Sequence, residues 1–283
     1  MGYVDDLIER AESVRSIVCM GMDPVIEKIP IQGDPRQVIE EFYLDILKEM
    51  NKRNSFPAVI KPNIAYFEQH GFDGLNALST IISQYKSSGV PVLLDAKRGD
   101  IGRTSLAYAK SVFEFWDSDS VTVAPYMGSD SVGPFIEWCE KGKGVYILCR
   151  TSNKGAADLQ DLKVDGVPVY MKLAENIIQW HKPGVSAVVG ATYLEELEKI
   201  SRFFVESKIE VPLLIPGVGS QGGSAGEVVE VLKKTKNDIL IHRINSSSGI
   251  NYAYLEKDTS DYAKAAVDAL EILNKEIGPL VTM

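Results

Sequence analysis

Eight short apolar runs, rich in β-branched residues, alternate with helix-length amphipathic stretches, and this alternation limits the fold more than any other feature of the chain. The runs are SIVCMGMD (16–23), AVIKP (58–62), VPVLLDAK (90–97), SVTVAP (120–125), GVYILC (144–149), VSAVVG (185–190), VPLLIPGVG (211–219) and DILIHRI (238–244). Continuous apolar runs of this kind are typical of parallel strands that are covered on both faces. The pattern therefore predicts an α/β protein with a parallel sheet.

Amphipathic patterns of helical length follow the runs, at 35–53, 74–88, 104–115, 133–142, 169–181, 193–207, 225–235 and 260–276. Eight strands, each followed by a helix, predict a (βα)8 TIM barrel. The acidic, amphipathic stretch 1–14 predicts an extra helix before the first strand, and it lacks the basic and then apolar order of a secretory signal. A chain of 283 residues fits one barrel, so we expect a single domain over residues 1–283.

A doubly wound open sheet is the alternative fold, because it also alternates strands and helices. Such a sheet usually carries a glycine-rich dinucleotide fingerprint after its first strand, where this chain reads GMDPVIEKIP. The glycine cluster GVGSQGG (217–223) instead follows the seventh run. Barrel enzymes commonly bind phosphate at that position, so the glycines favour the barrel.

Charge and composition exclude several classes of partner. The formal net charge of -9 and the sequence pI near 5.0 argue against nucleic acid, which demands a basic face. No run approaches the roughly 20 apolar residues of a membrane span. The three cysteines have no CxxC spacing, and two lie in apolar runs, so we expect reduced core thiols in a cytoplasmic protein. The histidines His70, His181 and His242 are scattered, and we expect no metal site.

Charged side chains follow two of the predicted strands. Asp95, Lys97 and Asp100 stand in LLDAKRGDIGRTSLAYA, and Lys61 closes the second run. Side chains alternate along a strand, so Asp95 and Lys97 should point the same way, toward the end of a barrel where active sites lie. Two lysines between two aspartates in a partly dry site would stabilise negative charge that develops on carbon.

Four motifs in barrel order give the chain a resemblance to a known family: KPNIAYFE (61–68), DAKRGDIG (95–102), CRTSNKGA (149–156) and PGVGSQGG (216–223). The chain resembles the orotidine 5'-phosphate decarboxylases, particularly their longer branch in bacteria and archaea. Magnesium-dependent sugar-phosphate decarboxylases and hexulose-phosphate synthases share the DxKxxD pattern. Lys61 separates the chain from those relatives, which typically have an acid at that position.

The resemblance implies a cofactor-free lyase that converts orotidine 5'-monophosphate to uridylate and CO2, the last step of de novo UMP biosynthesis in the cytoplasm. Lys97 would stabilise the carbanion at C6 of the pyrimidine and then protonate it. Asp95 would lie against the substrate carboxylate, and Lys61 and Asp100 would complete the charge array. With two carboxylates near an anionic substrate group, the empty site should be strained, so we expect Asp95→Asn to stabilise the fold while reducing catalysis.

The resemblance also implies a homodimer with shared active sites, because Asp100 with Ile101 and Thr104 would reach into the partner's site. Asp23 would bind ribose hydroxyls. Thr151 and Ser152 would bind the pyrimidine ring.

The phosphate would lie at the glycine loop, where the resemblance assigns Pro216, Gly217 and Gln221. The chain departs from the family pattern here, since Ser248 stands where an arginine is expected. We predict that Arg243, or serine hydroxyls with loop amides, binds the phosphate instead.

Two other functions stay open from sequence. The chain could be a magnesium-dependent sugar-phosphate decarboxylase or aldolase on the same barrel. It could also be a phosphate-ligand binding barrel without turnover, a reading that the missing arginine motivates.

Overall fold

The computed structural model describes residues 2–219 and 223–277. Eight strands form one parallel sheet: β1 (Val18–Met22), β2 (Val59–Pro62), β3 (Leu93–Arg98), β4 (Ser120–Val123), β5 (Gly144–Arg150), β8 (Val185–Val189), β9 (Leu213–Ile215) and β10 (Arg243–Ser246). The hydrogen-bonded order is β2-β1-β10-β9-β8-β5-β4-β3. Two parallel bridges, Ile60 with Val92 and Asn63 with Asp95, join β2 to β3 and close the sheet into a barrel. The predicted (βα)8 fold is confirmed.

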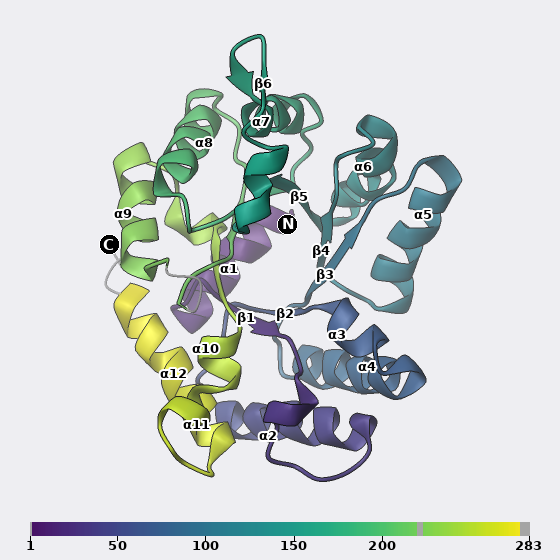
Figure 1. Cartoon of the computed structure of the whole chain (residues 1–283), viewed down its shortest axis with the longest axis vertical. Helices are drawn as coiled ribbons and strands as arrows, with labels where there is room; N and C mark the ends of the chain where they lie inside the picture. The colour runs from purple at the N-terminus through teal and green to yellow at the C-terminus, as the bar shows by residue number, and fades with distance from the viewer. Residues whose placement is uncertain (1, 220–222, 278–283) are drawn as a thin grey trace.

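Helices surround the strands, as Figure 1 shows. The long ones are α1 (Tyr3–Val14), α2 (Pro35–Arg53), α4 (Gly71–Ser87), α5 (Gly102–Lys110), α6 (Ser129–Ile136), α7 (Val169–Gln179), α8 (Leu194–Glu206), α9 (Ala225–Thr235) and α12 (Tyr262–Ile277). Shorter ones are α3 (Ile64–Glu68), α10 (Ser248–Asn251) and α11 (Ala253–Glu256). Local sequence sets the bounds of α2, because the Asp34 side chain accepts from Gln37 N at 2.9 Å and Pro35 follows as the first helical residue.

Two apolar layers stabilise the barrel. Alternate strand residues pack outward against the helices, and these include Met20, Ile60, Leu94, Val121 and Ile147. The side chains between them fill the barrel interior together with two residues of α1; this inner cluster is Tyr3, Leu7, Cys19, Val59, Leu93, Tyr146, Val188 and Leu214. The alternation of period 2 along each strand therefore sorts the residues between the two layers.

Helix α1 closes the amino-terminal end of the barrel. Its Tyr3 hydroxyl donates to the Tyr146 hydroxyl at 3.1 Å, and the two rings meet edge to face. Gly144, where β5 begins, lies so close to the Tyr3 ring that a Cβ there would overlap it. The predicted extra helix thus serves as the floor of the barrel, which leaves the carboxyl ends of the strands for a site.

The last strand begins later than the sequence pattern predicts. Residues 238–244 were expected to form it, but Ile239–Ile241 form a 3-10 helix and β10 covers Arg243–Ser246. The register with β1 explains the shift, because Ile244 pairs with Val18 and Ser246 with Met20. The apolar residues at 239–241 belong to a turn beneath the barrel, and the polar residues after them form the strand.

A small hairpin follows β5 and was not predicted. It consists of β6 (Lys163–Val164) and β7 (Val167–Pro168), and Figure 1 shows it projecting beyond α7. Its turn residues, Asp165 and Gly166, both have positive φ, at 53° and 81°. An Asp-Gly pair between valines is a recognised hairpin signal, so the sequence did carry the information. Within the described residues, no helix is both long and apolar enough to cross a membrane.

Candidate active site

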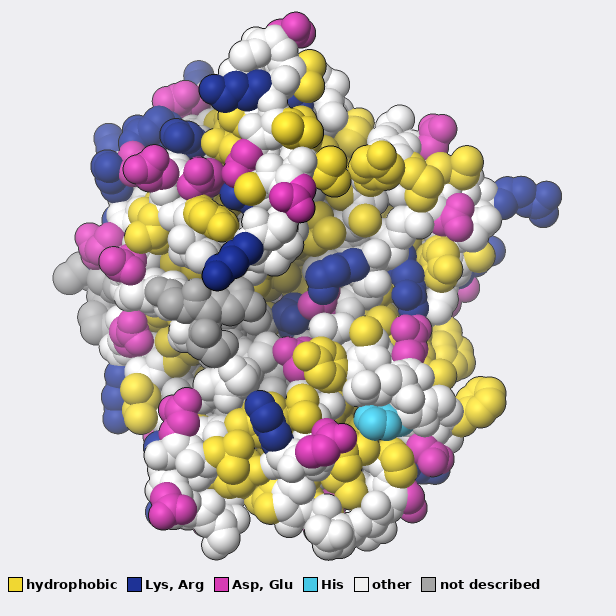
Figure 2. All heavy atoms as spheres, viewed as in Figure 1, with side chains coloured by type: hydrophobic (Ala, Val, Ile, Leu, Met, Phe, Trp, Pro, Cys, Tyr) yellow, Lys and Arg dark blue, Asp and Glu magenta, His cyan; other side chains and the backbone are white. Residues whose placement is uncertain are grey.

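The inner layer of the barrel changes from apolar to charged at the carboxyl ends of β2 and β3. Val59 and Leu93 belong to the apolar interior, and Lys61 and Asp95 lie two residues further along the same strands. Because alternate residues share a face, these charged side chains point into the same barrel interior. Figure 2 shows basic and acidic side chains side by side near the middle of this face of the molecule.

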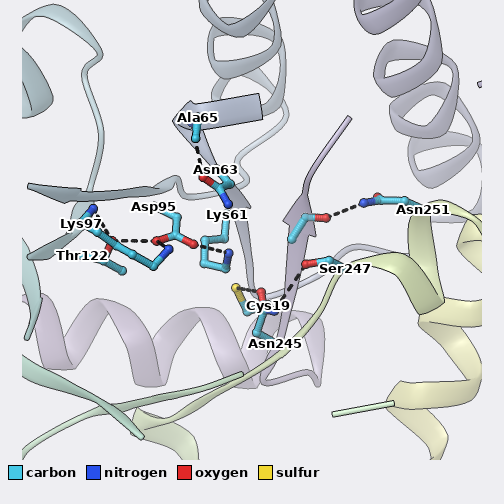
Figure 3. Close-up of polar contacts among 11 residues, drawn as sticks. Cys19, Lys61, Asn63, Ala65, Asp95, Lys97, Thr122, Asn245, Ser247 and Asn251 are labelled. Atoms are coloured by element: carbon cyan, nitrogen blue, oxygen red, sulfur yellow. Dashed lines mark hydrogen bonds and ion pairs between the residues drawn. The ribbon is translucent and has the colours of Figure 1, made fainter. Parts of the chain in front are cut away.

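Asp95 lies between two lysines (Figure 3). Lys61 Nζ donates to Asp95 Oδ2 at 2.8 Å, and Lys97 Nζ donates to Asp95 Oδ1 at 2.7 Å. Lys61 and Asp95 are buried, with 4% and 7% of their surface exposed, whereas half of the Lys97 side chain reaches solvent. The structure thus brings together three of the four charges that the sequence predicted to converge, and one lysine remains accessible to a ligand.

The charges in this cluster hold one another ionised. Burial alone would raise the pKa of Asp95, but the positive charges of Lys61 and Lys97 hold that pKa well below its usual range. Burial alone would lower the pKa of Lys61, but the negative charges of Asp95 and Asp23 raise it above its usual value. The negative charge of Asp23 thus also favours the ionised form of Lys61.

A bulge in β3 sets the direction of Lys97. Asp95, Ala96 and Lys97 lie between the pairs that Leu94 and Arg98 make with β4, where the facing strand has Thr122 alone. Lys97 adopts φ 44°, a left-handed conformation that costs energy for a residue with a side chain. Bulges and strained residues of this kind concentrate next to active sites, where they aim a side chain.

Thr122 was missed by sequence reasoning, although it lies at the centre of the bulge. Its hydroxyl donates to Asp95 Oδ1 at 2.8 Å and accepts from Lys97 N at 3.0 Å. The hydroxyl therefore fixes both the carboxylate and the bulged backbone. The available signal was a polar residue inside the apolar run SVTV.

A pocket with a volume of about 250 Å³ lies beside the array, and we name it the Asp23 pocket. Its lining includes Asp23, Lys28, Gly217, Ser247, Ser248 and Tyr252. Asp23 Oδ1 is buried and has no hydrogen-bond donor within the part of the chain that the structure describes. A buried carboxylate oxygen without a donor is costly, so a ligand hydroxyl is a suitable partner for it.

Other predicted ligands also lie at the carboxyl ends of the strands. Thr151 follows β5; its amide donates to Gln160 Oε1 at 2.9 Å and its hydroxyl donates to Asn153 at 2.7 Å. Ser152 packs against Gly190, where a Cβ would lie 2.8 Å from the Ser152 Cα. This segment is therefore fixed at the rim of the barrel.

The glycine loop begins at the end of β9. Pro216 O accepts from Ala191 N at 2.8 Å, and Gly217, with φ 98°, lines the Asp23 pocket. Gln221 lies outside the described residues.

The prediction that Arg243 binds the phosphate is wrong. Arg243 is the first residue of β10 and is 1% exposed, at the opposite end of the barrel from the charge array. Its guanidinium donates to Leu240 O and His242 O, and to Leu7 O of α1 at 2.7 Å. The error follows from the predicted strand bounds, which put Arg243 near the carboxyl end of the strand instead of at its start.

Asp100, Ile101 and Thr104 stand apart from the array. The Asp100 carboxylate accepts from Ile101 N at 2.7 Å, and no ion pair of Asp100 is found among the described residues. Ile101 is 52% exposed although it is apolar, and Thr104 lies on the exposed first turn of α5. One chain therefore does not bring the fourth predicted charge to the other three.

A closed (βα)8 barrel with a buried Lys-Asp-Lys array at the carboxyl ends of its strands has the architecture of a barrel enzyme, since such enzymes work at this end. Residues 17–261 match the orotidine 5'-phosphate decarboxylase / HUMPS family. The chain belongs to this family.

Similar proteins support the same assignment. The orotidine 5'-phosphate decarboxylase of Janthinobacterium sp. (strain Marseille) is 37% identical over 98% of this chain and 100% of its own length. That of Halorubrum lacusprofundi is 38% identical over 98% of this chain and 99% of its own. The solved OMP decarboxylase of Leishmania donovani superposes with a TM-score of 0.75 at 33% identity, covering 98% of both chains.

Proposed function

We propose that this chain is an orotidine 5'-monophosphate decarboxylase, a carboxy-lyase that forms uridylate and CO2 without a metal or an organic cofactor. The observation that carries the proposal is the position of Asp95 between Lys61 and Lys97. The family also includes the HUMPS branch. The lysine on β2 favours the decarboxylase, because it places a cation where a magnesium-dependent relative would have an acid.

Lys97 and Asp95 divide the chemistry between them. The substrate carboxylate would lie against Asp95, whose negative charge disfavours the bound ground state and favours the loss of CO2. The bond between C6 and the carboxylate breaks, and its electron pair stays on C6. The Lys97 ammonium stabilises this charge and then transfers a proton to C6, which leaves a neutral amine that regains a proton from water.

The remaining groups would bind the nucleotide. Asp23 accepts hydrogen bonds from the ribose hydroxyls through its Oδ1 atom, which has no donor among the described residues. Thr151 and Ser152 bind the pyrimidine ring at the end of β5. Pro216, Gly217 and Gln221 belong to the loop that receives the phosphate.

The active enzyme would be a homodimer in which Asp100, Ile101 and Thr104 complete the partner's site. Exposed apolar side chains on and near α5 support an interface there; they are Ile101, Leu106, Tyr108, Phe115, Tyr126 and Met127. Figure 2 shows apolar side chains gathered where Figure 1 places α5 and α6. Exposed apolar side chains that gather on one part of a surface are typical of protein–protein interfaces.

We also propose that the chain works as one domain, and that it does so in the cytoplasm. The described strands all join one closed sheet apart from the small hairpin, which supports a single working domain over residues 1–283. The reaction would be the last step of de novo UMP biosynthesis, in the cytoplasm.

The loss of orotidylate absorbance tests the proposal. Wild type should consume orotidylate with EDTA present, and Lys97→Ala should be almost inactive, because general acid catalysis and charge stabilisation are both lost. Lys48→Ala is the control, since Lys48 lies on the outside of α2 and pairs with Asp45. Inertness of the wild type toward orotidylate, or loss of activity in EDTA, would reject the proposal in favour of a magnesium-dependent sugar-phosphate enzyme. Tight binding of a 6-substituted uridylate without turnover would indicate a binding protein.

A further inference from the structure

The proposed substrate carries a 5'-phosphate with nearly two negative charges, and the chain needs a group to recognise it. Arg243 lies at the other end of the barrel, and Ser248 is neutral. The Asp23 pocket already contains one carboxylate, so a second anion would be repelled unless a cation faced the same space. The question is which side chain supplies that cation.

Lys28 is the positively charged side chain among the described residues that line the Asp23 pocket. It ends the single turn of 3-10 helix Ile26–Lys28 in the connection between β1 and α2. Gly217, Ser247 and Ser248 line the same pocket, so the lysine shares it with the glycine loop and with the residues that follow β10. Lys61 is not among the residues that line this pocket, and it pairs with Asp95.

Two tyrosines hold Lys28 in place. The Tyr252 hydroxyl accepts from Val25 N at 2.8 Å and donates to Asp23 O at 2.8 Å, which fixes the path of the connection. The Tyr254 hydroxyl donates to Lys28 O. Lys28 Nζ then lies 5.2 Å from the centre of the Tyr252 ring, within the range of a cation-π contact.

Among the described residues, the ammonium of Lys28 has no acidic partner. No carboxylate within 4.0 Å of Lys28 Nζ is found in the part of the chain that the structure describes. A cation that rests on an aromatic face and has no acidic partner can accept an anionic ligand without first breaking an ion pair.

We propose that Lys28 recognises the 5'-phosphate of the nucleotide. It would take the role of the arginine that the family pattern has at the position of Ser248. The inference rests on the proposed function for its ligand. It divides the Asp23 pocket between two groups: Asp23 takes the ribose hydroxyls, and Lys28, which lines the pocket together with Gly217 and Ser248, takes the phosphate. The segment that contains Ser248 also contains Tyr252 and Tyr254, whose hydroxyls form hydrogen bonds with the backbone at and near Lys28.

Equilibrium binding of uridine 5'-monophosphate and of uridine tests the assignment without relying on turnover. Wild type should prefer the nucleotide. Lys28→Ala should bind it about 10- to 100-fold more weakly and bind uridine equally well, because one charge-assisted contact is lost. Lys48→Ala removes an exposed lysine from the outside of α2 and should change neither affinity.

A second variant separates charge recognition from a structural role. Lys28→Ala combined with Ser248→Arg should regain most of the preference for the nucleotide, since Ser248 also lines this pocket and the arginine returns a cation to it. An unchanged ratio of the two affinities in Lys28→Ala would overturn the inference, as would equal weakening of nucleotide and nucleoside. Absence of decarboxylation by the wild type would reject the proposed function alone, because the binding ratio is measured independently.

Discussion

Lys61 and Asp95 form the most deeply buried ion pair of the site, and their pairing matters for the stability of this end of the barrel. Taking both charges out of water costs several kcal/mol per ion, which their attraction and hydrogen bonds offset. Burial raises the pKa of Asp95, but the two lysines lower it further, so the fold favours the ionised carboxylate. We therefore expect Asp95 to stabilise the site without substrate, which is the opposite of the strain that the sequence led us to predict.

Asp95→Asn should accordingly destabilise the fold, by about 3 kcal/mol, because Lys61 would keep a buried charge without its nearest counter-ion. The shape of the side chain is retained, and Thr122 can still donate to the amide oxygen. Urea denaturation at pH 7 measures the change in the free energy of unfolding. Glu140→Gln, which breaks the exposed pair with Lys182, should have little effect. Equal or higher stability of Asp95→Asn would show that the empty site is strained after all.

Among the elements of the barrel, β10 shows that the sequence predicted the presence of a strand but not where that strand begins. The alternation of apolar runs and helices predicted all eight strands, and the ends of the second and third runs predicted the contact of Lys61, Asp95 and Lys97. The start of β10 was misplaced, because the apolar residues 239–241 have strand composition but form a turn. Only pairing with β1, a contact between the two ends of the chain, selects the register.

The β3 bulge and the position of Lys28 depend on distant contacts in the same way. A sequence of alternating residues contains no sign that three residues of β3 face Thr122 alone. Lys28 lies in an irregular connection, and it reaches the Asp23 pocket because Tyr252 and Tyr254, far along the chain, bind the backbone around it. Local patterns describe neither contact, so the residue that replaces the arginine could not be found from sequence.

Arg243 has a structural role, because it links β10 to α1. Arg243→Ala should destabilise the fold by about 3 kcal/mol, because hydrogen bonds to buried carbonyls are lost and a cavity remains. The bond to Leu7 O ties α1 to the barrel, so the floor of the barrel should loosen first. Chemical denaturation gives the stability, and orotidylate kinetics well below the melting temperature should give an unchanged KM. A KM raised as much as in Lys28→Ala would restore Arg243 to the phosphate site.

His242 links the stability of β10 to pH. Its Nδ1 accepts from Leu213 N of β9 at 2.9 Å, and burial, followed by the charge of Arg243, lowers its pKa to about 3. A histidine that is neutral when folded stabilises the fold above its unfolded pKa of about 6.5, and this contribution is lost as the pH falls toward the folded value. Between pH 7 and pH 5 the chain should lose about 2 kcal/mol from this group.

Denaturation curves at several pH values measure this loss in wild type and in His242→Asn, which keeps an acceptor near the position of Nδ1. The variant is expected to be less stable at pH 7 but to show a flatter dependence on pH. If both proteins lose stability in parallel over this range, His242 does not titrate on unfolding as its burial implies.

The two ends of the barrel have different roles: the amino-terminal end stabilises the fold, and the carboxyl end contains the site. At the amino-terminal end, α1 seals the interior with Tyr3 and Leu7 and covers Arg243. At the carboxyl end, Lys61, Asp95 and Lys97 lie at the bottom of an open face. Asp100 belongs to this face but stays outside the array of its own chain, next to the apolar surface of α5. The molecule is thus incomplete as a monomer if the array requires four charges.

Mixing two inactive variants tests whether the sites are shared. Lys97→Ala and Asp100→Ala should each have little activity alone. Half of randomly reassorted dimers contain one chain of each kind, and one of their two sites then has a native Lys97 from one chain and a native Asp100 from the other. The mixture should therefore regain about a quarter of wild-type activity.

Lys97→Ala mixed with Asp95→Ala is the matched control, because Lys97 and Asp95 come from the same chain and no native site can form. Recovery in the first mixture alone would require that Asp100 act across a dimer interface; silence in both would place the whole site within one chain.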